Sequence, residues 1–100
     1  MSQRGIGRTT RQLERLPDGG FFLVPNHCIR RHCEGLLRDL GRDPRSINIV
    51  TADLAERGIW GVRVKAWDVD HAYFEVAGRR GQRAFDCLGM AAGKGPLSHE

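Results

Sequence analysis

Apolar residues recur at helical spacing between residues 26 and 41, and this is the clearest pattern in the chain. The stripe follows the order i, i+4, i+7, i+8 and i+11, and its members are Ile29, Cys33, Leu36, Leu37 and Leu40. Asn26 precedes the stripe as a candidate N-cap, and Gly41 follows it as a stop signal. The pattern predicts an amphipathic helix that packs on a sheet through its leucine side.

Short apolar runs bounded by turn residues predict three strands. The run at 21–24 is apolar throughout, which is typical of a strand covered on both faces in a parallel sheet. Residues 47–50 predict a second strand and residues 62–70 a third. The third strand would place Trp67 and Val69 on one face. Its opposite face would carry Val62, Val64 and Ala66.

Two shorter helices complete an alternating order. Residues from Thr9 to Leu16 favour a helix that ends at the turn 17–20. A second short helix runs from Ala52 to Arg57, with Thr51 as its N-cap and Gly58 as its stop. Helices that alternate with buried strands predict βαβ units and a parallel sheet.

The last thirty residues fit two structures. Residues 73–76 and 84–88 read as strands of an antiparallel hairpin or meander, whereas residues 82–92 also repeat their apolar positions at helical spacing. We therefore predict a minimal three-layer α/β domain with a short, mainly parallel sheet, to which a C-terminal antiparallel hairpin is added. The alternative is an α+β domain with a C-terminal antiparallel meander. The domain would span residues 1–92, followed by a flexible tail at 93–100.

The segment from Gly5 to Thr10 carries the strongest candidate chemistry. A phosphate-binding loop of the Walker type reads G-x-x-x-x-G-K-[ST], and aligning its last glycine with Gly7 places Arg8 at the lysine and Thr9 at the hydroxyl. Asp70 ends the third predicted strand, where a carboxylate can hold Mg²⁺ close to phosphates. We therefore expect these residues to form one site.

A family resemblance points the same way. Four stretches together resemble small P-loop proteins of phages and mobile elements, which begin with a G-x-G-R-T-T-R loop and carry V-D-H at the end of a later strand. These stretches are Gly5 to Arg11, Phe22 to Asn26, Ile47 to Thr51 and Val69 to His71. The resemblance implies a nucleotide or phosphate site, with ATP or GTP and Mg²⁺ as the cofactors.

The same resemblance implies a role for each residue of the site. Backbone N–H groups of Gly5, Ile6 and Gly7 would surround the anion, Arg8 would contact its oxygens, and Thr9 and Asp70 would face the metal. Thr10 belongs to the same anion-binding segment. Arginine lacks the compact charge of the usual lysine, so we expect binding with little or no hydrolysis, and not an efficient enzyme.

Charge also favours an anionic partner. The chain has 16 Lys and Arg against 12 Asp and Glu, a formal net charge of +4, and nearly all its cations are arginines. Arg4, Arg8, Arg11 and Arg15 would share one helix face and could follow a nucleic-acid backbone. The residues predicted to bind a partner are Arg11, Arg15, Arg30, Arg31 and Trp60. The alternative function is a non-enzymatic inhibitor of a host defence system, similar to anti-CRISPR proteins, in which this surface binds a host protein complex.

Cysteine content predicts a reduced, cytoplasmic protein. Three cysteines cannot all pair, and no apolar run suggests secretion or a membrane span. Cys28 and His32 are four residues apart and would share a helix face, as two metal ligands do. No C-x-x-C pair accompanies them, so we predict ordinary core and flanking residues and no protein metal centre.

Overall fold

A computed structural model describes the backbone of residues 3–58 and 64–97. Its elements, in chain order, are α1 (Gln3–Arg15), β1 (Phe21–Val24), α2 (His27–Asp39), β2 (Asn48–Thr51), α3 (Ala52–Gly58), β3 (Trp67–Val69), α4 (Tyr73–Ala77), the 3-10 helix η1 (Gly78–Gly81) and α5 (Gln82–Ala92).

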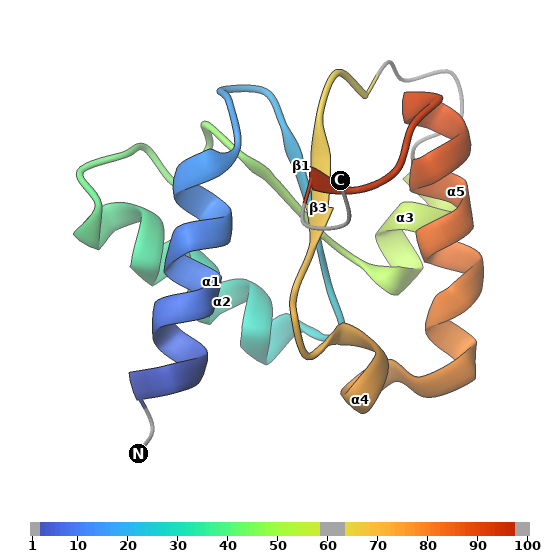
Figure 1. Ribbon diagram of the computed structural model, residues 1–100, viewed down its shortest axis with the longest axis horizontal. Coiled ribbons are helices and arrows are strands. Elements are labelled where there is room, and N and C mark those ends of the chain that lie inside the picture. Colours follow the sequence, from blue (N-terminus) through green and yellow to red (C-terminus); the bar gives the residue numbers. More distant parts are fainter. Residues whose placement is uncertain (1–2, 59–63, 98–100) are drawn as a thin grey trace.

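The three strands form one parallel sheet in the order β2-β1-β3. Phe22 lies at the centre of the register, opposite Ile49 on β2 and Asp68 on β3. Helices α1 and α2 cover one face of the sheet, and α3 and α5 cover the other (Figure 1). The predicted parallel sheet is confirmed, in a small domain of mixed helices and strands.

Side chains alternate across the sheet and produce two hydrophobic cores. Phe22, Val24 and Ile49 pack with the leucines of α1 and α2. Phe21 and Leu23 point to the opposite face and pack with residues of α3, β3 and α5. The continuous apolar run of β1 is therefore explained by burial on both sides, as its sequence predicts.

Helix α2 follows the predicted pattern closely. The Asn26 side chain accepts a hydrogen bond of 3.0 Å from the backbone N–H of Ile29, which is the expected N-cap contact. Cys33, Leu36 and Leu37 are buried against the sheet. Gly41 follows the helix with φ of 75°, a left-handed conformation that suits glycine.

The third strand is shorter than predicted. Only residues 67–69 form β3, because the central strand β1 is short and pairs with β3 through residues 21–23 alone. Val64 packs in the same core as Trp67 and Val69, and not on the opposite face, since the chain bends between residues 64 and 67. Val62 lies outside the described residues.

The C-terminal region is helical. Residues 73–76, predicted as a strand, belong to α4, and the predicted helix at 82–92 is confirmed as α5. Ala84 and Leu88 recur on the buried side of α5, so the helical spacing reflected the real structure. Residues 64–97 contain no antiparallel strand pair, so the predicted hairpin and the alternative meander are both wrong.

The chain continues to pack beyond α5. The indole nitrogen of Trp67 donates a hydrogen bond of 2.9 Å to the backbone carbonyl of Lys94. Pro96 is buried, and Leu97 packs against the core formed with α1 and α2. Residues 93–97 thus connect the α5 side of the sheet to its opposite face.

Helix α1 starts earlier than predicted. It begins at Gln3, so Gly5 to Thr10 lie inside the helix, and the expected loop conformation is wrong. Glycine lowers helix propensity by about 1 kcal/mol relative to alanine, which is why the sequence favoured a loop here. The apolar stripe of Leu13 and Leu16, both buried, holds the helix on the sheet.

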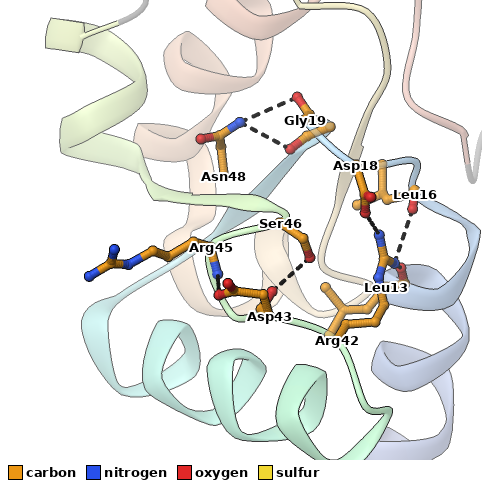
Figure 2. A network of polar contacts seen from close by, with 10 residues as sticks. Leu13, Leu16, Asp18, Gly19, Arg42, Asp43, Arg45, Ser46 and Asn48 are labelled. Atoms are coloured by element: carbon orange, nitrogen blue, oxygen red, sulfur yellow. Dashed lines mark hydrogen bonds and ion pairs between the residues drawn. The ribbon is translucent and has the colours of Figure 1, made fainter.

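Arg42, in the loop after α2, closes the other end of α1. One guanidinium nitrogen donates to the carbonyls of Leu13 and Leu16 at 2.9 and 3.1 Å, and the other contacts Asp18 at 2.7 Å (Figure 2). Carbonyls in the last turn of a helix lack helical partners and attract cations. Arg42 therefore fixes α1 to the α2–β2 connection.

Candidate functional site

A buried polar contact joins α1 to the end of β3. The hydroxyl of Thr9 donates a hydrogen bond of 3.2 Å to a carboxylate oxygen of Asp70, across 61 positions of sequence. Both side chains are buried. The structure therefore brings together the two residues that the sequence predicted to face a metal ion.

Gln12 lies one turn after Thr9 and extends the network. Its side-chain nitrogen donates to the carbonyl of Val69 at 2.6 Å and to a carboxylate oxygen of Asp68 at 3.3 Å. Its side-chain oxygen accepts the backbone N–H of His71 at 3.2 Å. The Gln12 amide thus contacts Asp68, Val69 and His71 around the end of β3.

Two carboxylates line the same face of β3. Asp68 and Asp70 are two positions apart, so strand alternation points both toward α1. Asp68 is fully buried and accepts the backbone N–H of Val69 at 2.8 Å. The second oxygen of Asp70 accepts the backbone N–H of Ala72 at 3.3 Å. The site is therefore rich in ordered oxygen atoms.

Cys33 of α2 lies close enough to Asp70 for the carboxylate charge to affect its pKa. Burial, and then the negative charges of Asp70 and Glu34, raise the pKa of its thiol from an ordinary 9.0 to about 12. The thiol stays protonated at neutral pH. Cys33 therefore fills the core and supplies no thiolate to the site.

The position of the network in the fold is typical of ligand sites. Parallel strands all end at one edge of their sheet, and β1 continues there into α2 while β3 continues into α4 (Figure 1). The order β2-β1-β3 places a topological switch point between β1 and β3. Open α/β sheets bind ligands outside the carboxyl ends of strands at such a point.

The other residues predicted to bind the anion lie along α1. Gly5 and Gly7 lie in the first two turns of α1, and Thr10 is half-buried beside Thr9. The side chain of Arg8 lies outside the described residues. Their role in anion binding therefore remains a prediction.

The predicted partner surface is only partly described. Arg11 and Arg15 are exposed on α1 and border a shallow hollow together with Glu14. Arg31 is exposed on α2, and Arg30 lies 3.9 Å from Glu34 one turn later. Trp60 lies outside the described residues.

Sequence reasoning missed Gln12 and Asp68. Gln12 shares the buried side of α1 with Leu13 and Leu16, and a polar residue at such a position was a usable signal. Asp68 stands between two apolar residues of a strand, which is also unusual. Within residues 9–56 and 64–97, no three His, Cys, Asp or Glu side chains gather as metal ligands.

Comparison of the chain with protein-family models, with curated proteins and with solved structures found no match. None of the helices in the described ranges has the length and apolar character needed to cross a bilayer.

Proposed function

We propose that this chain binds a nucleotide phosphate together with Mg²⁺ beside Thr9 and Asp70, with little or no hydrolysis. The observation that carries the proposal is the buried hydrogen bond of 3.2 Å between these two side chains. In P-loop proteins, a threonine or serine hydroxyl at the start of a helix and an aspartate at the end of a strand hold Mg²⁺ between them.

The two side chains fit a magnesium ion chemically. Mg²⁺ prefers oxygen ligands in an octahedron at about 2.1 Å, so neighbouring ligands lie about 3 Å apart. The Thr9 and Asp70 oxygens are 3.2 Å apart, so both could bind the same ion with little movement. The phosphates would occupy coordination positions of the ion that the protein leaves free, as they do at magnesium sites with few protein ligands.

The start of α1 supports an anion at the same end of the domain. The first four N–H groups of a helix have no helical partner, and the helix dipole is positive there. The first turn of α1 contains no acidic residue that would offset this charge. A phosphate at this first turn would therefore meet a favourable field, about two helical turns before Thr9.

The helical form of Gly5 to Thr10 argues against efficient turnover. A phosphate-binding loop wraps its N–H groups around the transferred phosphoryl group, and this positioning supplies most of the catalysis. A helix can offer a phosphate only the free N–H groups of its first turn. We therefore assign the site to binding.

Nucleotide-dependent thermal stability tests the proposal. ATP or GTP at one hundred times its dissociation constant should stabilise the protein by about 2.7 kcal/mol, and the effect should require Mg²⁺. Asp70→Asn preserves the shape of the side chain but weakens metal binding, so it should remove the effect. Thr9→Val should reduce it.

Thr51→Val is the matched control, because it also removes a threonine hydroxyl at a strand end but lies on β2. It should leave the nucleotide effect unchanged. The proposal fails if millimolar nucleotide with Mg²⁺ leaves the melting temperature unchanged, or if Asp70→Asn responds as fully as the unmodified chain.

A further inference from the structure

β2 is an edge strand of the described sheet, and Ile49 on it is 6% exposed. Asn48 donates its backbone N–H to Gly20 beside β1 at 2.9 Å, so the groups of Ile49, one position on, point away from β1. Within the described ranges, the N–H and C=O of Ile49 have no hydrogen-bond partner. Such an edge is a template for another extended strand.

A groove of about 320 Å³ follows this edge, between α2 and α3. Arg30 and Glu34 of α2 form one wall, and Leu54 of α3, which is 41% exposed, contributes to the other. Arg45 lies at the amino end of β2. The groove therefore combines unpaired backbone, an apolar side chain and charge.

The charges favour an acidic occupant. Glu34 lies 3.9 Å from Arg30 and offsets it, whereas the guanidinium of Arg45 points away from Asp43 and Ser46 (Figure 2). The groove thus keeps a positive charge at the amino end of β2. A carboxylate there would gain a charge-assisted contact.

The same charges disfavour a second copy of this chain. In an antiparallel pair of β2 strands, Arg45 of one copy would approach the carboxyl end of β2 in the other. Arg30 lies at that end, because α2 begins where the parallel strands finish. Because Glu34 already offsets Arg30, Arg45 would meet no unpaired carboxylate at that end, and the pairing would gain no favourable charge contact.

We propose that the outer edge of β2 binds an extended acidic peptide segment of a partner protein, which adds a fourth strand to the sheet. Main-chain hydrogen bonds to Ile49 give affinity, and Arg45 selects carboxylates. The groove and the Thr9–Asp70 site lie at different strands, so this proposal does not depend on nucleotide binding.

A fluorescent eight-residue peptide, with valine and glutamate in alternation, is the probe. It should show saturable binding by anisotropy, and the amide of Ile49 should become protected from hydrogen exchange. A peptide N-methylated at alternate amides cannot pair with a strand edge, so it should bind at least tenfold more weakly. A version with lysine in place of glutamate should also bind at least tenfold more weakly.

Two charge-reversal variants test whether a residue of the groove, and not the overall charge of the protein, determines the affinity for the peptide. Arg45→Glu should weaken binding at least tenfold, whereas Arg31→Glu, an exposed change outside the groove, should leave it unchanged. Circular dichroism would verify that both variants fold. The proposal is overturned if the peptide does not bind at millimolar concentration, or if the N-methylated or lysine peptide binds equally well. Protection of Ile49 by self-association without peptide would also overturn it.

Discussion

Gln12 on α1 and Asp68 on β3 are 56 residues apart in the chain, yet the side-chain nitrogen of Gln12 lies 3.3 Å from a carboxylate oxygen of Asp68. The same nitrogen donates to the backbone of Val69, and the amide oxygen accepts from His71. A single buried amide therefore fixes the end of β3 against the first helix.

Gln12→Leu should destabilise the fold. Leucine has a similar size but no polar atoms, so the buried carbonyl of Val69 would lose its donor and the part-buried N–H of His71 would lose its acceptor. Each buried group left unsatisfied costs about 1–3 kcal/mol. Urea unfolding would measure the loss. Arg11→Leu, at the exposed neighbouring position, should change the free energy of unfolding by about 0.5 kcal/mol or less. Equal midpoints for both variants would contradict the network.

Thr51→Val should raise stability. The hydroxyl of Thr51 is buried and has no hydrogen-bond partner in the described part of the chain, so the predicted cap of α3 is not formed. An unpaired buried hydroxyl costs about 1–3 kcal/mol, and valine replaces it with a methyl group of nearly the same shape. Thermal and urea unfolding would detect the gain. A lower midpoint would show that the hydroxyl has a stabilising contact.

Tyr73 provides a pH test, because it is the single tyrosine of the chain. Its hydroxyl donates to the carbonyl of Gly81 at 2.8 Å. Burial, and then the charge of Glu56, raise its pKa from an ordinary 10.0 to about 12. The folded state thus favours the neutral phenol, so its contribution to stability is complete below pH 10 and is lost as the pH rises toward 12.

Phenolate absorbance would follow this titration. The folded protein should titrate well above the denatured chain, and Tyr73→Phe should remove the signal. A folded-state midpoint equal to that of the denatured chain would contradict the buried hydrogen bond.

Leu37→Ala tests the packing of α2. Leu37 is fully buried in the core shared with α1, and truncation of such a leucine costs about 2–5 kcal/mol. Leu54→Ala is the control, since the same truncation at an exposed position should cost far less. Similar urea midpoints for the two variants would show that α2 does not pack as described.

Local signals explain which parts of the fold could be predicted. Asn26, the leucine stripe and Gly41 each act within a few residues, so α2 was predicted with its cap and its stop. The four apolar residues of β1 likewise required burial on both faces. In contrast, the start of α1 contains two glycines that locally favour a loop, and the short C-terminal runs fit strand and helix equally well.

The candidate site divides in the same way. Thr9 and Asp70 could be paired from motif spacing and from the rule that ligand residues follow parallel strands. Gln12 and Asp68 each stand out as polar residues among apolar neighbours, but their contact with one another follows only from the packing of α1 on β3. Their burial depends on contacts between segments more than fifty residues apart, which local sequence cannot specify.

The contact between Thr9 and Asp70 also constrains how the protein is made. The two residues are 61 positions apart, and ribosomes add about 5–20 residues per second, so Asp70 follows Thr9 by roughly 3–12 s. During that interval the nascent first helix lacks both its polar partners and part of its apolar cover. Translational pausing before β3 would prolong this exposure, whereas release of β3 from the ribosome would end it.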